Sequence, residues 1–326
     1  MGDVRVHMKI EGRVQGVWLR IRPFHGVWLM AFMGLMVAIS GCGSTVALSK
    51  KVLPASLAKV LPGQPVLKKR VMVLPFVDQA DVGAERADTL SRTFYDALKE
   101  APGLILTKPP DGIFSSMAMR SPQYGIVTSS RLIDYAERQG MNAIVVGVLN
   151  PVEIATRKTG IWPFDKWRKY YIVSVSVNII DTVSKTLFLT HMESDDFSVP
   201  LEEAEQMDPE LFIADCLREA LPELVEDQVS VIETALEDYP WTGKILAVEN
   251  GTIMINGGDD IGVKTGQRFE IFSMGRTISA GSGRTVHLLR EAEGEIEVTQ
   301  VMEAHALADA VAGGPFVPKQ LVRVKR

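Results

Sequence analysis

The residues best suited to chemistry lie close to the start of this 326-residue chain. The run GRVQGV occupies residues 12–17, and Arg20 follows shortly after it. Glycines allow a loop to bring its backbone N–H groups close to a ligand, and an arginine adds a permanent charge with several donors. A loop of this composition could therefore bind a phosphate group.

The same residues resemble the phosphate-binding signature of the acylphosphatases. The resemblance implies that the loop amides and Arg20 bind an acyl phosphate, and that an asparagine on the following strand orients water. This sequence has no asparagine before Asn142, and an apolar stretch begins at Val27 instead of a second strand. We therefore predict that the motif is not functional, and acylphosphatase is kept only as an alternative function.

An uncharged, almost wholly apolar stretch runs from Val27 to Ile39. As a helix it would rise about 20 Å, which is short of the roughly 30 Å hydrocarbon core of a membrane. Basic residues precede it and small residues follow it, the pattern of a secretory signal peptide. The unusually long segment before it is explained by a start at Met8 or Met30, or by a relic of a neighbouring gene.

The stretch ends in Ile39, Ser40, Gly41 and Cys42, which resemble the lipobox of bacterial lipoproteins. The resemblance implies that residues 1–41 are cleaved off and that Cys42 is acylated, so that its acyl chains hold the mature protein on a membrane. Because the next residue is glycine and not aspartate, the sorting rule of enteric bacteria implies the outer membrane, facing the periplasm. The alternative is a truncated transmembrane anchor with a chance cysteine.

The remainder of the chain is acidic. Residues 1–41 hold five of the 35 basic and two of the 40 acidic residues, which leaves a net charge of −8 for the rest. Such a body argues against nucleic-acid binding, which needs a basic face. The two cysteines, Cys42 and Cys216, cannot form a disulfide framework or a cysteine-rich metal site.

Hydrophobic periodicity divides the mature chain into three parts. Residues 42–69 contain scattered prolines and no sustained period, which predicts a tether. Residues 70–240 predict alternating strands and helices, and therefore a mixed sheet with helices packed against it. Residues 241–326 predict short strands between glycine turns, as in a small β-barrel. The fold class is therefore α+β.

The predicted elements of the middle part follow from the same patterns. A kink or a break in the last helix is expected near Pro222, because proline lacks the N–H that a helix interior needs. The predicted strands are 70–79, 104–107, 142–154, 169–181 and the run after the turn at 181–185, and the predicted helices are 83–103, 129–140 and 208–236.

Residues 70–238 resemble the TolB N-terminal/CsgG-like α/β module, on the pattern VMVLPF at 71–76 and the strand NAIVVGVL at 142–149. The stretch that begins at Ile245 resembles the C-terminal domain of FlgT, a flagellar basal-body protein whose middle domain is itself TolB-like. These resemblances imply a role in assembling the flagellar basal body or a similar machine. A CsgG-like outer-membrane secretion component is the alternative that they leave open.

No catalytic, cofactor-binding or metal-binding constellation is apparent in the mature sequence. Its histidines, His191, His287 and His305, are far apart and lack the spacing of zinc ligands. Cys216 falls on an apolar helical face, which predicts a core thiol. The glycine-rich stretch 256–267 lacks the residues of a phosphate loop or an EF-hand and predicts tight turns.

One stretch stands out as a surface for contact. Residues 155–171 place Trp162, Phe164 and Trp167 among five basic residues, between two predicted strands. Aromatic and basic side chains together are typical of partner contacts and of membrane interfaces. We predict that these three aromatic residues bind a partner; the alternative is a loop folded back onto its own sheet.

The sequence thus predicts a non-enzymatic, lipid-anchored envelope protein that acts as a scaffold or assembly factor. Its expected partners are the membrane, through acylated Cys42, and envelope or flagellar basal-body proteins. Self-association into a homo-oligomer is compatible with this interpretation.

Overall fold

The computed structural model describes residues 67–116, 125, 127, 129–279 and 285–325. Residues 64–326 form one compact unit. The acylphosphatase-like motif, the lipobox and nearly all of the predicted tether lie outside the described residues. The signal peptide and the acylation of Cys42 therefore remain predictions, as do the domain boundaries.

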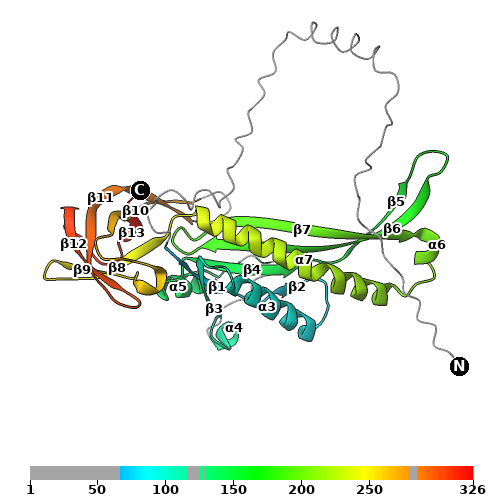
Figure 1. The fold of residues 1–326 in the computed structure, drawn as a ribbon, viewed down its shortest axis with the longest axis horizontal. Coiled ribbons are helices and arrows are strands. Elements are labelled where there is room, and N and C mark those ends of the chain that lie inside the picture. The colour runs from blue at the N-terminus through cyan, green and yellow to red at the C-terminus, as the bar shows by residue number, and fades with distance from the viewer. Residues whose placement is uncertain (1–66, 117–124, 126, 128, 280–284, 326) are drawn as a thin grey trace, which may run out of the picture. The chain divides into compact units, whose positions relative to one another are not determined.

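A seven-stranded mixed sheet forms the first part of the unit (Figure 1). β1, β2, β3 and β4 run parallel to one another, whereas β6 pairs antiparallel with β4, β5 and β7. β4 and β5 lie one after the other along the same edge of the long strand β6. The strands are β1 (Lys69–Val73), β2 (Val77–Asp78), β3 (Leu104–Thr107), β4 (Ala143–Leu149), β5 (Glu153–Thr159), β6 (Lys166–Asp181) and β7 (Thr186–Pro200).

Helices cover both faces of the inner strands, which explains why these strands read as continuous apolar runs. Along β1, Val71 and Val73 pack toward α3 and α7, whereas Met72 packs toward α5. α7 packs along the outer strands β6 and β7, and from Tyr171 to Val177 only one face of β6 carries fully buried residues. The helices are α3 (Ala84–Lys99), α4 (Ile113–Ser116), α5 (Ser130–Arg138), α6 (Leu201–Ala204) and α7 (Pro209–Asp238).

Helix α7 continues through Pro222, so of the kink or break expected there the break does not occur. The side chain of Asp208 caps its first turn by accepting from the backbone N–H groups of Glu210 and Leu211, at 3.0 and 3.5 Å. Buried residues occur on both sides of Pro222, from Phe212 to Leu236. Their packing on the sheet offsets the roughly 3 kcal/mol that an interior proline costs a helix.

A closed six-stranded antiparallel barrel follows, in the order β10-β11-β12-β9-β8-β13. Its core includes Trp241 and Phe269, whose rings meet edge to face at 5.9 Å. The predicted α+β class, a mixed sheet followed by a small barrel, is therefore confirmed. The barrel elements are β8 (Thr242–Glu249), β9 (Thr252–Ile255), a 3₁₀ turn (Asp259–Ile261), β10 (Arg268–Ser279), β11 (Thr285–Val301), β12 (Ala306–Gly313) and β13 (Leu321–Val324).

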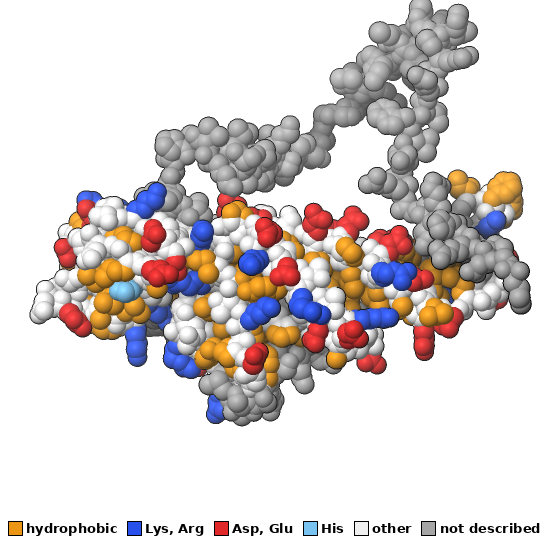
Figure 2. Space-filling view, turned by 60° about the horizontal axis from the view of Figure 1, so that its bottom comes forward, with side chains coloured by type: hydrophobic (Ala, Val, Ile, Leu, Met, Phe, Trp, Pro, Cys, Tyr) orange, Lys and Arg blue, Asp and Glu red, His pale blue; other side chains and the backbone are white. Residues whose placement is uncertain are grey.

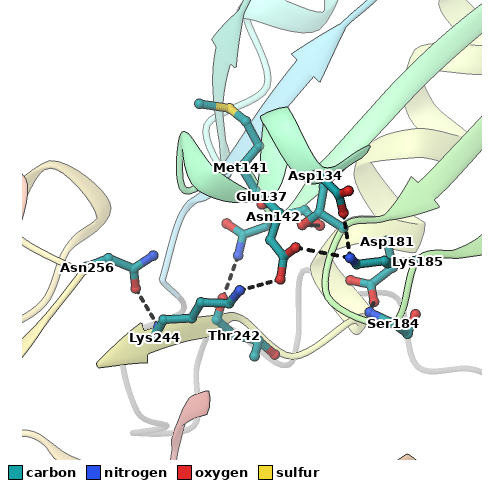
Figure 3. Close-up of polar contacts among 11 residues, drawn as sticks. Asp134, Glu137, Met141, Asn142, Asp181, Ser184, Lys185, Thr242, Lys244 and Asn256 are labelled. Atoms are coloured by element: carbon teal, nitrogen blue, oxygen red, sulfur yellow. Dashed lines mark hydrogen bonds and ion pairs between the residues drawn. The ribbon is translucent and has the colours of Figure 1, made fainter. Parts of the chain in front are cut away.

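Polar contacts join the sheet to the barrel, as Figure 3 shows in part. The side chain of Asn142 accepts from the backbone N–H of Arg70 at 3.0 Å and donates to the carbonyl of Thr242 at 2.8 Å. Glu137 on α5 forms an ion pair with Lys244 on β8. These groups satisfy backbone atoms at the ends of strands from both parts, so the junction is specific and not merely a linker.

Candidate functional site

The candidate site is the tip of the hairpin formed by β5 and β6. These strands pair antiparallel from Glu153 opposite Ile172 to Thr159 opposite Lys166, which leaves residues 160–165 as the tip. Residues 155–171 were predicted to link two strands as a loop; that prediction is wrong, because most of them belong to the strands β5 and β6. The single strand expected over 142–154 instead ends at Leu149, and a new strand begins at Glu153.

Gly160 makes the tight turn at the tip. Its φ of +113° is rarely adopted by other residues, and a Cβ there would lie 3.0 Å from Cα of Asp165. Within the turn, the N–H of Phe164 donates to the carbonyl of Ile161 at 2.7 Å. Lys158 and Asp165 close the tip with an ion pair, and the hydrogen bond from Lys158 lowers the pKa of the Asp165 carboxyl.

Large apolar side chains project from this tip into solvent. Ile161 is 85% exposed, Trp162 and Phe164 are each 82% exposed, and Trp167 is 53% exposed. These exposures exclude a loop folded back onto its own sheet. Among the described residues, half of the ten exposed large hydrophobic side chains lie in this one hairpin, the fifth being Ile154. Figure 2 shows hydrophobic side chains at the projecting end of the hairpin, beside a basic one.

Basic side chains lie directly behind the apolar tip. Arg157 and Arg168 are directly opposite each other on the two strands, so they point to the same face of the hairpin. Arg168 donates to the hydroxyl and to the carbonyl of Ser198 on β7, at 3.1 and 2.7 Å, and Arg157 lies over the ring of Tyr170 at 5.4 Å. The site therefore has an apolar end and a positively charged collar.

The other end of the hairpin is held in the protein core. Tyr171 is 1% exposed, and its ring meets Phe212 of α7 edge to face at 4.8 Å. Phe197, opposite Tyr171 on β7, is also buried. β6 continues from this anchored region to the tip without interruption. The tip is therefore presented by a packed strand and not by a free loop.

The cysteine and the histidines noted in the sequence do not form a catalytic group among the described residues. Cys216 is buried, and burial raises the pKa of its thiol to about 12, so the reactive thiolate does not form near neutral pH. His191 contacts Gln228 and Glu193 at 3.1 and 3.3 Å. His305 is half-buried, and the side chain of His287 lies outside the described residues.

The stretch 256–267 forms tight turns, as predicted. Gly262 and Gly266 both have positive φ, and Asp260 pairs with Arg70 at 2.7 Å. Within the part of the chain that the structure describes, no group of three or more histidine, cysteine, aspartate or glutamate side chains is placed to hold a metal ion. Asp260 therefore has a structural partner in the protein itself.

A groove of about 500 Å³ between α3 and α7 was not anticipated from the sequence. It is lined largely by apolar side chains, among them Leu90, Leu217 and Leu221, with Arg86 and Arg218 also on its lining. The amphipathic spacing of both helices predicts that they pack together, but the sequence does not show where the packing leaves a gap.

Comparisons with known proteins give only weak structural similarities. No family model matches the sequence, and no curated protein matches it. The PelC dodecamer from Paraburkholderia phytofirmans is 10% identical with a TM-score of 0.28, over 54% of this chain and 93% of that chain. Lipoprotein GNA1162 from Neisseria meningitidis is 14% identical with a TM-score of 0.27, over 51% and 99%.

The C-terminal domain of LpoB from Escherichia coli is also similar, at 14% identity and a TM-score of 0.27, over 43% of this chain and 93% of that chain. At such identities, and with TM-scores below 0.5, these similarities lend this chain no function. The CsgG-like module and the FlgT-like domain therefore remain resemblances of the sequence.

Proposed function

We propose that this chain is a lipid-anchored protein of the bacterial cell envelope that acts as a scaffold or assembly factor and not as an enzyme. The observation that carries the proposal is the exposed cluster of Ile161, Trp162, Phe164 and Trp167 on a hairpin whose base is packed in the core. Large exposed apolar clusters mark surfaces of contact, and tryptophan is enriched where such contacts contribute most.

The site has the chemistry of binding. Its side chains are apolar or permanently charged, and its one carboxylate at the tip, Asp165, is paired with Lys158. A general acid or base needs a proton affinity near neutral pH, whereas this pairing favours the ionised carboxylate. The proposed role of Trp162, Phe164 and Trp167 is therefore contact with a partner.

The lipid anchor is supported by the sequence alone. Ile39, Ser40 and Gly41 precede Cys42 as in a lipobox, and two or three acyl chains on a cysteine hold a protein firmly on a membrane. Gly43 supports export to the outer membrane, facing the periplasm. Among the described residues, no helix is both long and apolar enough to span a bilayer.

A narrower version of the proposal places the protein at the flagellar basal body. It rests on the resemblance of the C-terminal sequence to FlgT and on no structural comparison. Motility of a deletion strain distinguishes this version, because loss of swimming is expected if the flagellum is the machine served. Normal swimming would restrict the proposal to another envelope assembly.

The proposal is tested by separating inner and outer membranes from cells that express the full chain. After the membranes are washed with high salt, which weakens attachment through charged side chains, the wild type is expected in the outer-membrane fraction and a Cys42→Ser variant is expected to be absent from it. A second variant, with Trp162, Phe164 and Trp167 replaced by serine, should reach the outer membrane normally but fail to complement the deletion strain. Outer-membrane localisation of Cys42→Ser, or full complementation by the triple variant, would contradict the proposal.

A further inference from the structure

We propose that the tip of the β5–β6 hairpin inserts into the surface of an anionic lipid bilayer. This inference rests on the proposed envelope function, and it names the partner of the exposed aromatic site. The hairpin would then give the protein a second membrane attachment, separate from the acyl chains predicted on Cys42.

The layered chemistry of the hairpin favours a lipid partner. Ile161, Trp162 and Phe164 occupy the turn, and Trp167 lies on the first part of β6. Tryptophan is enriched at the boundary between hydrocarbon and headgroups, where its ring contacts acyl chains while its N–H stays hydrated. Charged residues follow at once on both strands, so only the turn and its immediate neighbours can enter the hydrocarbon.

The charge of the hairpin favours an anionic surface. Residues 153–172 hold five basic and two acidic residues, although the whole chain has a net charge of −5. One of the two acidic residues, Asp165, is already paired with Lys158. A positive hairpin on an acidic protein would be oriented toward a negatively charged membrane, and each basic side chain near such a surface strengthens binding about fivefold.

The facing positions of Arg157 and Arg168 also favour an anionic lipid surface. Like charges directly across two strands destabilise a hairpin, and Arg157 and Arg168 stand in this arrangement. Arg168 uses Nε and one Nη for Ser198, and Arg157 lies over an aromatic ring. Phosphate groups of lipids placed just behind an inserted tip would relieve this repulsion, because they would lie at the level of the two guanidinium groups.

The support of the hairpin means that insertion needs no refolding. Tyr171 and Phe197 anchor its base beneath α7, and the tip is already extended into solvent. The apolar side chains are therefore exposed before a membrane is met. This arrangement is expected of a preformed insertion element.

The test uses residues 43–326, which lack Cys42 and so carry no lipid anchor. This version contains every buried residue of the three hydrophobic clusters, which extend from Leu67 to Val322. Sedimentation with vesicles of phosphatidylcholine and phosphatidylglycerol in a 7:3 ratio should show binding. Binding should weaken with added salt and with vesicles of phosphatidylcholine alone.

Two triple variants distinguish vesicle binding by the hairpin tip from nonspecific binding through other exposed apolar side chains. Serine at positions 162, 164 and 167 should reduce vesicle binding by about tenfold or more, because most of the insertable apolar surface is lost. Serine in place of Met192, Leu211 and Leu246 removes side chains that are also exposed but lie on other elements, and it should leave binding unchanged. Circular dichroism of each variant confirms that it is folded.

Charge substitutions test separately the contribution of the basic side chains behind the tip. Arg157→Gln combined with Lys166→Gln should weaken binding to the anionic vesicles by about twentyfold, whereas Lys99→Gln combined with Arg131→Gln, on exposed positions of the helices and their ends, should not. Lys166 is chosen in place of Arg168, whose contacts with Ser198 are structural.

Three results would overturn the inference: no vesicle binding by the wild type, equal binding by the tip variant, or binding indifferent to phosphatidylglycerol. If vesicle binding is absent while a photo-crosslinker at position 164 captures one protein in cells, the tip docks onto a protein and not onto lipid. That result would leave the proposed envelope function in place. Loss of acylation at Cys42 would contradict that function without affecting these vesicle measurements.

Discussion

Replacing the exposed aromatic residues should leave the stability of the protein almost unchanged, whereas replacing the tyrosine at the base of the hairpin should not. In the triple variant Trp162→Ser, Phe164→Ser and Trp167→Ser, the substituted side chains are 82%, 82% and 53% exposed. Because Trp162 and Phe164 bury little surface and Trp167 about half of its own, their loss should change the free energy of unfolding by less than about 2 kcal/mol in total, as is usual for surface substitutions. Tyr171→Ala instead removes a ring that is 1% exposed.

The expected cost of Tyr171→Ala is about 3–5 kcal/mol, as for other buried aromatic residues replaced by alanine. Part of this cost is the edge-to-face contact with Phe212 at 4.8 Å. Urea unfolding of residues 43–326, followed by circular dichroism, measures both variants on one scale. A loss of more than about 2 kcal/mol in the triple variant would show that the tip packs against the protein, and it would refute the exposed contact surface.

Three further predictions concern residues away from the tip. Asn142→Ala should lower the free energy of unfolding by about 2–4 kcal/mol, because the backbone N–H of Arg70 and the carbonyl of Thr242 lose their partner. Asn142→Asp keeps the acceptor for the Arg70 N–H and should cost less than the alanine variant. Urea unfolding compares the two variants. Burial lowers the pKa of Lys69 to about 8 in the folded state, against 10.5 for the free side chain. Between these pH values the unfolded chain binds more protons than the folded protein, so the stability of the wild type rises with pH. The difference in stability between Lys69→Met and the wild type, from thermal unfolding, should therefore shrink as the pH rises from 8 to 10.5. Cys216 should resist iodoacetamide at pH 8 in the folded protein and react after unfolding in urea, as mass spectrometry can show, because its raised pKa keeps the thiol protonated.

Hydrophobic periodicity predicts the sheet, its helices and the small barrel because each pattern is set by local geometry. The apolar run around Val145 predicts a strand buried on both faces, and helices do cover both of its faces. The alternation from Tyr171 to Ile179 predicts a strand with one core face, and α7 packs on that face. The pattern of apolar residues along each strand shows which of its faces are buried, so the sequence alone is enough to predict these elements.

The features that were predicted wrongly depend on contacts between distant residues. Pro222 suggests a kinked or broken helix, but the helix is not broken, because the packing of both halves on β6 and β7 outweighs the local cost. The segment after Ile154 carries no strand pattern, since it is largely polar, and becomes part of β5 only by pairing with β6. The tip was recognisable from its composition, whereas its exposure depends on how far β6 extends beyond α7.

The junction between sheet and barrel could not be predicted, because Asn142, Thr242 and Lys244 come together only in the folded chain. Nothing in the spacing of these residues distinguishes them from other polar residues at the ends of strands. Asn142 follows a helix and precedes a buried strand, and that position alone indicates a turn.

The central claim is most directly tested by intact-mass and peptide mass spectrometry of the mature protein extracted from cell membranes. The account predicts that the N-terminal residue is Cys42 and that it carries a diacylglyceryl group with or without a third acyl chain. A chain that begins upstream of Cys42, or one with an unmodified cysteine, would contradict the lipid anchor and with it the proposed place of this protein in the envelope.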